Sequence, residues 1–310
     1  MSFGLVLGAG GLVGIAHHVG VLRALEREGG VIADKADLIV GTSAGSAIAA
    51  YVRSGWSTDD LYRRVRDLPV VAPVSSTNGS VDLARRLVGS AYVVARSALP
   101  SPAILWPKIP PAMRRAFPAG LVSSGSAPQL LKMDLPAGWP ARPLYICALD
   151  LVEGRRMVLG DGVAPEVDLA VAVQASCAIP GFYPPVRVGN HVLVDGGAYS
   201  LTNLDLAANF GCDVVVCVAP MAHAPGNSSP PHFRVMRMLP SMALRREAVG
   251  ARRRGARVVL LAPGAAELRA HGYNPMRANG LESVTDAAYE ATARAIDRGE
   301  LADLIGEVAA

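Results

Sequence analysis

The N-terminal part of the chain alternates between continuous apolar runs and segments with a single apolar face. Phe3–Leu7 is an uninterrupted apolar run of strand length, and a second such run follows at Leu38–Val40. Between them, apolar residues recur at the spacing of one helical face, at Ile15, Val19 and Leu22. This spacing predicts an amphipathic helix that reaches about Arg27 and ends at Gly29-Gly30.

Each apolar run leads through a glycine-rich turn into a helix. Gly8-Ala9-Gly10-Gly11 follows the first run, and Gly41-Thr42-Ser43-Ala44-Gly45 follows the second, ahead of an alanine-rich helix to about Arg53. Strand, turn, helix, repeated twice, is a βαβα opening, which implies a parallel sheet with helices on its faces. The sequence therefore predicts an α/β protein with a mostly parallel central sheet.

The rest of the chain contains further strand and helix patterns and one segment without clear periodicity. Apolar runs predict strands at Leu144–Leu151, in a hairpin with Arg156–Leu159, and at His191–Val194, Asp213–Val218 and Arg257–Leu261. Helices are expected at 166–175, between the strands at 213–218 and 257–261, and at 281–295. Residues 68–143 contain a dense set of prolines together with apolar residues. We interpret this segment as a cap or insertion within a single domain that covers residues 1–310.

Composition narrows the class of protein. The 310 residues are 51% hydrophobic, which excludes a disordered chain. Only 5% are aromatic and the arginines are mostly scattered, so nucleic acid is not expected as a partner. No apolar window of membrane-spanning length occurs. The four cysteines show neither a CxxC pair nor a zinc-like spacing. We therefore expect a cytoplasmic protein with reduced thiols and no bound metal or cofactor, and its oligomeric state stays open.

The second glycine-rich turn has the pattern of a nucleophile turn. A serine between a buried strand and a helix requires small neighbours, because the backbone bends sharply there. Gly41 and Gly45 meet this requirement around Ser43. The turn also places Ser43 at a helix N-terminus, where amide groups point toward developing negative charge. A tight turn with serine as a helix cap is the structural alternative.

An attacking serine needs donors for the oxyanion and a base for its proton. Gly8–Gly11 can supply the donors, because glycines let successive amides form one concavity at the carboxyl edge of a parallel sheet. For the base, His17 and His18 follow the glycine loop but belong to the body of the predicted helix, and the other four histidines, at 191, 223, 232 and 271, have no surrounding motif. Asp195 is the better candidate, since it ends a strand and precedes Gly196-Gly197, although this triplet by itself is also an ordinary turn.

These motifs, in this order, resemble the bacterial patatin-like phospholipases. The resemblance covers about residues 3–210 and includes Gly8–Gly14 with His17, the Gly20-Val21-Leu22 stretch, Gly41–Gly45, Ala175–Pro180 leading to Phe182–Pro185, and Asp195-Gly196-Gly197. It implies a three-layer α/β/α sandwich and hydrolysis of acyl esters of lipids without a metal. It also implies a Ser43–Asp195 dyad and an oxyanion hole from the amides of Gly10 and Gly11, with Ala44 as a further donor. Gly8, Gly14, Gly41, Gly45, Gly196 and Gly197 would support these loops.

Two positions depart from the family pattern. Ala9 replaces the first of three glycines, and Val13 stands where the family usually has a basic residue. The resemblance therefore implies ester hydrolysis more firmly than a preference for phospholipid. After Asp195, the sequence Asn203-Leu204-Asp205 comes later than the family's Asn-x-Pro and lacks its proline. This difference affects the expected orientation of the loop after Asp195, but not the assignment of Asp195 itself.

Three alternatives use the same residues differently. A soluble carboxylesterase, thioesterase or lysophospholipase would keep the fold and change the substrate, and an inactive relative would only bind lipid. A dinucleotide-binding oxidoreductase would use the first glycine turn, but Glu28 does not end the second strand as that site requires.

Two segments could face a membrane, where lipid substrates lie. One consists of the apolar cap residues Leu99, Ile104, Leu105, Trp106 and Phe117, and the other is His232–Arg246, where methionines and leucines alternate with arginines. For both, packing against the rest of the protein is the simpler interpretation.

Overall fold

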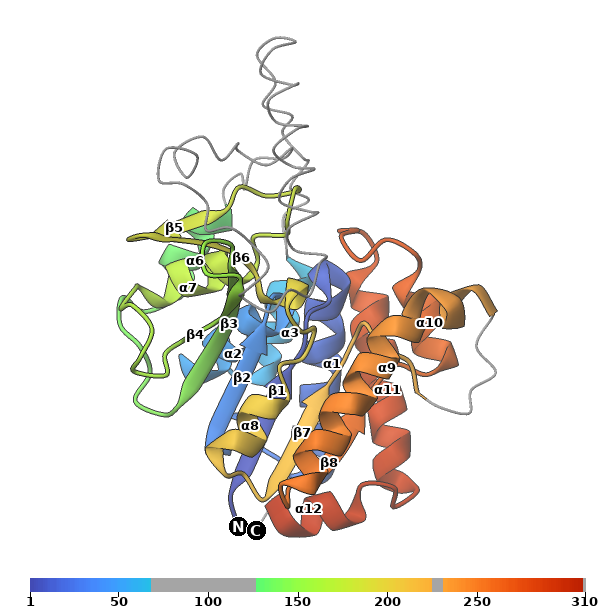
Figure 1. Cartoon of the computed structure of the whole chain (residues 1–310). Coiled ribbons are helices and arrows are strands. Elements are labelled where there is room, and N and C mark those ends of the chain that lie inside the picture. The colour runs from blue at the N-terminus through green and yellow to red at the C-terminus, as the bar shows by residue number, and fades with distance from the viewer. Residues whose placement is uncertain (68–126, 225–230, 309–310) are drawn as a thin grey trace. The chain divides into compact units, whose positions relative to one another are not determined.

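The computed structural model describes residues 1–67, 127–224 and 231–308, and the chain forms two compact units (Figure 1). The first unit comprises Met1–Val70, Pro140–Tyr145 and Leu201–Ala310, and the second comprises Val71–Trp139 and Ile146–Ser200. Most of the expected cap at 68–143, including the apolar residues at 99–117, lies outside the described residues.

The first unit contains the βαβα opening and most of the helices. Its elements are β1 (Phe3–Leu7), α1 (Gly11–Gly29), the 3₁₀ turn η1 (Ala33–Lys35), β2 (Leu38–Thr42), α2 (Ala44–Arg53), α3 (Thr58–Arg66), α8 (Asp205–Phe210), β7 (Val214–Val218), α9 (Pro231–Arg253), β8 (Arg257–Leu261), α10 (Ala265–His271), α11 (Leu281–Asp297) and α12 (Ala302–Val308). The predicted βαβα opening with its two glycine turns is therefore confirmed.

The strands of this unit are parallel and run in the order β2-β1-β7-β8. Strand β1 is central, with Leu7 opposite Gly41 of β2 on one side and Val218 of β7 on the other. All five residues of β1 are buried, as are those of β2 and β7. This explains why these strands read as continuous apolar runs, since helices cover both faces of the sheet.

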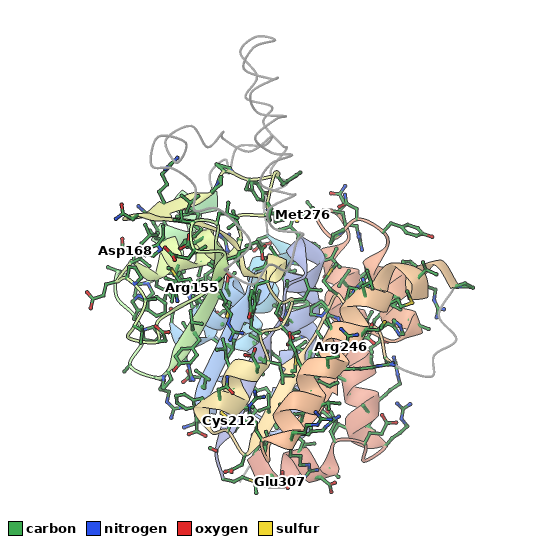
Figure 2. All side chains as sticks on the ribbon, viewed as in Figure 1. Arg155, Asp168, Cys212, Arg246, Met276 and Glu307 are labelled. Atoms are coloured by element: carbon green, nitrogen blue, oxygen red, sulfur yellow. The ribbon has the colours of Figure 1, made fainter. Side chains whose placement is uncertain are left out.

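Helices lie on both sides of these four strands. Figure 1 shows α8 and α9 in front of the strands and α1 and α11 behind them. Cys212, labelled in Figure 2, follows α8 and lies against Gly4 of β1, because a Cβ on Gly4 would be 2.8 Å from the Cys212 sulfur. The arrangement is an α/β architecture with a central sheet, as the sequence predicts.

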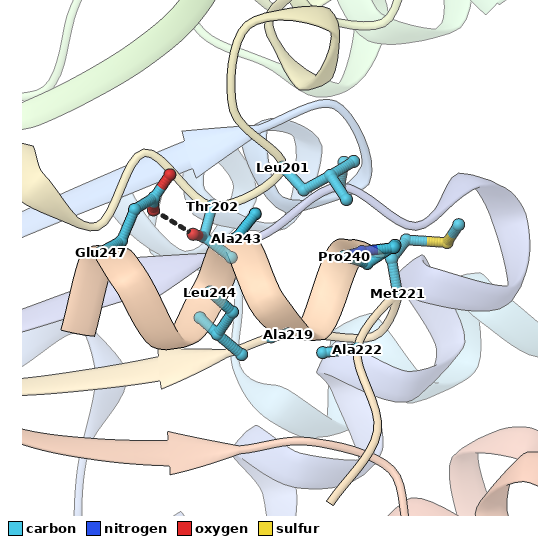
Figure 3. Close-up of a pocket in the computed structure, with 10 residues that line it drawn as sticks. Leu201, Thr202, Ala219, Met221, Ala222, Pro240, Ala243, Leu244 and Glu247 are labelled. Atoms are coloured by element: carbon cyan, nitrogen blue, oxygen red, sulfur yellow. Dashed lines mark hydrogen bonds between the residues drawn. The ribbon is translucent and has the colours of Figure 1, made fainter. Parts of the chain in front are cut away.

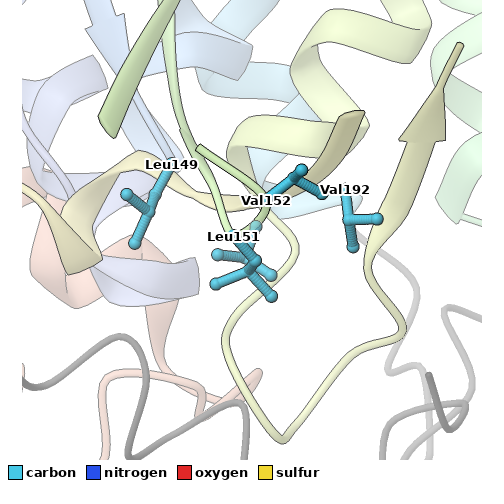
Figure 4. Packing of buried hydrophobic residues seen from close by; sticks show 5 residues of the cluster. Leu149, Leu151, Val152 and Val192 are labelled. Carbon is cyan, nitrogen blue, oxygen red and sulfur yellow. The ribbon is translucent and has the colours of Figure 1, made fainter. Parts of the chain in front are cut away.

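The second unit is built around antiparallel strands. Its described elements are α6 (Ala127–Asp134), β3 (Leu144–Asp150, which begins in the first unit), β4 (Arg155–Leu159), α7 (Leu169–Ser176), β5 (Val186–Val188), β6 (His191–Asp195) and the 3₁₀ turn η2 (Gly196–Ala198). Strand β6 pairs with both β3 and β5, and β4 pairs with β3 as the expected hairpin. A cluster of buried aliphatic side chains holds the unit together (Figure 4): Leu149, Leu151, Val152, Val192 and Val194.

Several helices differ from the sequence prediction, since α3, α8, α10 and α12 were not predicted. Helix α6 lies in the segment without clear periodicity, where no helix was predicted. Helix α7 begins at Leu169, later than the predicted 166, because Asp168 is its N-cap in an extended conformation. Within the described residues, no helix combines the length and the apolar character needed to cross a membrane.

Candidate active site

Ser43 has a backbone conformation that L-amino acids rarely adopt. It is the N-cap of α2, with φ 53° and ψ −119°, and only one other described non-glycine residue has a positive φ. A residue held in such a region costs about 1–3 kcal/mol and persists only where the surrounding structure fixes it. The Ser43 carbonyl accepts hydrogen bonds from the amide of Ser46 at 2.8 Å and from the Ser46 hydroxyl at 2.6 Å. The strained residue is thus fixed to the first turn of its helix.

The two glycines around Ser43 are required by close backbone contacts. A Cβ on Gly45 would overlap the carbonyl of Leu7 in β1, and a Cβ on Gly41 would lie 2.6 Å from Cα of Ser46. Helix α2 therefore packs directly against strand β1 at Gly45 and against the end of its own preceding strand at Gly41, which leaves no room for a side chain at either position. The structure gives this steric reason for the glycine spacing of the serine turn.

The Gly8–Gly11 loop is anchored to neighbouring segments of the first unit. The Gly8 amide donates to the Val218 carbonyl at 3.0 Å, and the Ala9 amide donates to the Leu201 carbonyl at 2.7 Å. Gly11 has a φ of 62°, and a Cβ there would meet the Pro275 carbonyl oxygen at 2.6 Å. The loop is therefore held in one conformation by three separate parts of the chain.

The anchored loop and the serine turn are neighbours. Strand register places Leu7 opposite Gly41, and a Cβ on Gly14 would be 3.4 Å from Cβ of Ala44. Helices α1 and α2 consequently begin next to each other, and neither has an acidic residue in its first turn. Both positive helix ends therefore lie beside Ser43, which favours negative charge at this place.

The first amide of each of these two helices has no backbone acceptor in the part of the chain that the structure describes. Within the described residues, the amides of Gly10, Gly11 and Ala44 donate to no backbone carbonyl, as is usual for the first amides of a helix. The structure therefore brings together Ser43 and the loop that was predicted to supply oxyanion donors.

Asp195 lies in the second unit, at the end of β6. It is 6% exposed, its amide donates to the Ala178 carbonyl at 2.9 Å, and its Oδ1 accepts a hydrogen bond from the Gly197 amide at 2.7 Å. A Cβ on Gly196 would overlap the carbonyl of Cys147, which also accepts a hydrogen bond from the Ser176 hydroxyl. Ala178 and Ser176 belong to the motif at Ala175–Pro180, so that motif shapes the environment of Asp195.

The histidines that were alternative bases have other partners. His18 is buried and contacts the Gly8 carbonyl through Nε2 at 2.7 Å, and burial lowers its pKa to about 4. His191 Nδ1 lies 2.7 Å from Oδ2 of Asp150 in the second unit, and His223 contacts the Ala224 carbonyl. The side chain of His232 is not among those described.

His17 and His271 form a buried polar cluster within the first unit. His17 Nδ1 is 3.2 Å from His271 Nε2 and 3.7 Å from Oε1 of Glu267. Burial lowers the pKa of His17, lowers that of His271 to about 3 and raises that of Glu267 to about 7. Arg237 contacts His271 Nδ1 at 3.1 Å and also donates to the carbonyls of Pro220 and Ala222.

Two residues near the site, His18 and Asn203, have structural roles that the sequence did not predict. His18 holds the Gly8 carbonyl and hence the glycine loop. Asn203 is buried at a φ of 53°, and its Nδ2 donates to Thr42 Oγ1 at 3.0 Å, next to Ser43. In the sequence, the only indication of a special role for Asn203 was that asparagine tolerates a positive φ. The fold shows that its side chain is hydrogen-bonded to the serine turn.

No described group of residues suggests a metal or a dinucleotide. Among the described residues, no three histidine, cysteine, aspartate or glutamate side chains converge as metal ligands would. Glu28 lies in the last turns of α1 and accepts a hydrogen bond from the Tyr289 hydroxyl, while the second strand ends at Thr42. The acidic residue is thus absent from the strand end where a ribose-binding group would lie.

The family model of the patatin-like phospholipases matches residues 5–208, and the chain belongs to this family. The matched range contains the glycine loop, the serine turn and Asp195. The family resemblance predicted from the motifs is therefore confirmed.

Individual relatives are distant. The chain is 27% identical over 217 residues to "Lysophospholipase NTE1" of Pyricularia oryzae, which covers 70% of this chain and 12% of that protein. It is 28% identical over 212 residues to the uncharacterised protein YqhO of Bacillus subtilis, which covers 63% of each. Among solved structures, VipD from Legionella pneumophila aligns with 96% of this chain and 67% of its own, with a TM-score of 0.48 and 14% identity. The chain spans less than two thirds of the length of these two curated relatives.

Proposed function

We propose that the chain is a serine lipid acyl hydrolase of the phospholipase A or lysophospholipase type. One observation carries the proposal: Ser43 is held at positive φ on a strand-to-helix turn, beside a loop in which the Gly10 and Gly11 amides have no backbone acceptor within the described residues. Strain at a serine in this position is expected of a nucleophile and costs stability in a simple turn. Family membership supports a lipid ester as the substrate.

In the proposed reaction, the Ser43 hydroxyl attacks the ester carbonyl carbon while Asp195 accepts its proton. The amides of Gly10, Gly11 and Ala44 stabilise the resulting oxyanion, and each such donor is typically worth about 10²–10³ in rate. Asp195 then gives the proton to the leaving alcohol, and the acyl group stays on Ser43 Oγ. Water attacks this acyl-enzyme with Asp195 as base, which releases the fatty acid and returns a proton to Ser43 Oγ.

The intact mass of the protein after reaction with a fluorophosphonate tests the nucleophile and the base together. We expect one adduct on the wild type and none on Ser43→Ala. On Asp195→Asn, the adduct should form about 10²–10⁴-fold more slowly than on the wild type. An adduct that forms on Ser43→Ala would overturn the assignment of the nucleophile. A normal rate on Asp195→Asn would move the role of base to a histidine, for which His17→Gln and His18→Gln are the next variants.

A substrate panel tests the class of ester. Val13 is buried and supplies no positive charge for a phosphate, so the preference must be measured on lysophospholipid micelles, diacyl phospholipid vesicles and short p-nitrophenyl esters. We expect release of fatty acid from at least one of the two lipids, and none by Ser43→Ala. Turnover of the short esters alone would favour the soluble carboxylesterase, and binding of lipid without any turnover would favour the inactive module.

A further inference from the structure

The long helix α9 has an outer face that no described part of the protein covers. Val235, Met238, Leu239, Met242 and Val249 are all exposed, with 70% of Val235 and 71% of Leu239 accessible to solvent. Their spacing of three, four and seven residues places them on one side of the helix. The expectation that the methionines and leucines of this segment pack against the protein is wrong for Met238, Leu239 and Met242, and it holds for the buried Leu244.

The same face continues as a cationic surface toward the C-terminal end of α9. Arg245, Arg246, Arg252 and Arg253 are exposed and follow the apolar residues at the same helical spacing; Figure 2 labels Arg246 on this face. The only acidic residue of α9, Glu247, lies on the inner side, where it accepts hydrogen bonds from the Thr202 hydroxyl and the Leu204 amide. The exposed face of α9 is therefore apolar in its first half, carries four arginines together with Val249 in its second half, and has no negative charge.

The inner side of α9 is attached to the backbone that holds the glycine loop. Figure 3 shows the pocket where Pro240, Ala243, Leu244 and Glu247 meet Thr202 and Ala219, and Ala9 of the loop lines the same pocket. Arg237 of α9 also donates to the carbonyl of Pro220, which lies against Gly10. Because Arg237, which lies in the N-terminal half of α9, reaches the Pro220 carbonyl beside Gly10, the apolar part of the outer face lies at the end of the sheet that carries Ser43.

We infer that the outer face of α9 binds the surface of an anionic lipid bilayer. An apolar stripe with a wide arginine border is the pattern of a helix that lies in the interface between headgroups and acyl chains. A second copy of this chain would fit less well, because the arginines of two such faces would repel each other. The inference rests on the proposed function, since a lipid hydrolase must reach its substrate from such a surface.

Co-sedimentation with vesicles tests this inference separately from catalysis. All proteins would carry Ser43→Ala, so that binding is measured without hydrolysis. The vesicles would contain phosphatidylcholine alone or phosphatidylcholine with about one third phosphatidylglycerol. We expect binding to the anionic vesicles, weak binding to the neutral ones, and a strong decrease at about 0.5 M salt.

Two double variants and two matched controls locate the surface. Met238→Ser/Leu239→Ser and Arg245→Gln/Arg246→Gln should each weaken binding about tenfold or more. The controls are Met133→Ser on α6 and Arg155→Gln on β4, which alter exposed residues of the same types in the second unit and should not change binding. Thermal melts would show that each variant is folded.

The inference would be overturned if the protein with an unaltered α9 did not bind anionic vesicles, or if the α9 variants bound them as strongly as that protein does. It would also be overturned by a dimer in analytical ultracentrifugation that Met238→Ser/Leu239→Ser dissociates. The last result would assign the face to a second copy. If the wild type released no fatty acid from either lipid but the vesicles were bound normally, the proposed function would be rejected and the assignment of the membrane-binding face would remain.

Discussion

The turn at Ser43 and the turn at Asp195 both end a buried strand, yet they are built differently. Ser43 has a positive φ, and its flanking glycines are pressed against the backbone of β1 and α2. Asp195 has an ordinary φ of −47°, and its carboxylate accepts a hydrogen bond from Gly197 two residues on, as in many turns. The nucleophile turn is thus imposed on its residue by packing, whereas the acid turn is a conformation that aspartate favours by itself.

This difference explains why the serine motif indicates a catalytic residue more specifically than the Asp-Gly-Gly motif does. A glycine-x-serine-x-glycine pattern after a buried strand requires an uncommon backbone path, so few other structures need it. An Asp-Gly-Gly triplet satisfies an ordinary turn and occurs without any catalytic role. If this contrast is correct, added side chains at the packed glycines of the serine turn should destabilise the protein more than a change of the Asp195 side chain.

Gly45→Ala should destabilise the protein most. The added Cβ would overlap the Leu7 carbonyl, and neither β1 nor α2 can move away without disturbing the buried sheet. We expect a loss of about 4 kcal/mol or more in the free energy of unfolding, or failure to fold. Gly306→Ala in α12 is the control, because nothing lies within 4 Å of its Cβ position, and it should change stability by at most about 1 kcal/mol. Similar urea midpoints for the two variants would contradict the packing argument.

The buried histidine that anchors the glycine loop should make the protein sensitive to acid. Burial lowers the pKa of His18 from 6.5 to about 4. As the pH falls from about 6.5 to about 4, the unfolded chain takes up a proton at this position and the folded chain does not, so stability decreases by about 3 kcal/mol. His17 and His271, whose pKa values burial also lowers, add to this decrease.

His18→Gln removes the titration and keeps a donor for the Gly8 carbonyl. Its unfolding free energy should therefore fall less steeply between pH 6.5 and pH 4 than that of the wild type. Glu267 acts in the opposite direction, because burial raises its pKa to about 7 and stability is lost as the pH rises from about 4.5 to about 7. Urea unfolding at a series of pH values measures both effects, and an unchanged acid slope in His18→Gln would count against the role of His18.

Asp195→Asn should affect stability little. The asparagine side-chain oxygen can still accept the hydrogen bond from Gly197, so we expect a change of less than about 1 kcal/mol. Asp195→Ala loses this acceptor and should cost about 1–3 kcal/mol, because the Gly197 amide is then unpaired. If Asp195→Asn destabilised as strongly as Asp195→Ala, the charge itself would be structural, which would break the contrast with Ser43.

Gly14→Ala should be nearly neutral. Its Cβ would make an ordinary contact with Cβ of Ala44 at 3.4 Å, and alanine favours helix by up to about 1 kcal/mol over glycine. The free energy of unfolding should therefore change by less than about 1 kcal/mol in either direction. A loss of more than about 2 kcal/mol would show that the two helix ends are packed more tightly than this distance indicates.

The N-terminal elements were predictable because their signals are local. The apolar runs at Phe3–Leu7 and Leu38–Val40, with glycines directly after them, define buried parallel strands whatever the rest of the chain does. Helix α6 was missed because its eight residues lie among prolines and carry no strong apolar stripe. The partners of the histidines were not predictable, since His17 and His271 are 254 residues apart in sequence.

The amino-acid sequence alone was enough to place Ser43 directly after a buried strand between two glycines, and Asp195 at the end of another strand before Gly196-Gly197, because these features depend on neighbouring residues. The fold had to be known to see that Gly45 lies against Leu7, that His18 contacts the Gly8 carbonyl, and that no described residue covers one face of α9. The physical reason is that burial and contact depend on residues far apart in the chain. An apolar stripe has the same spacing on a helix that faces the core and on one that faces the solvent.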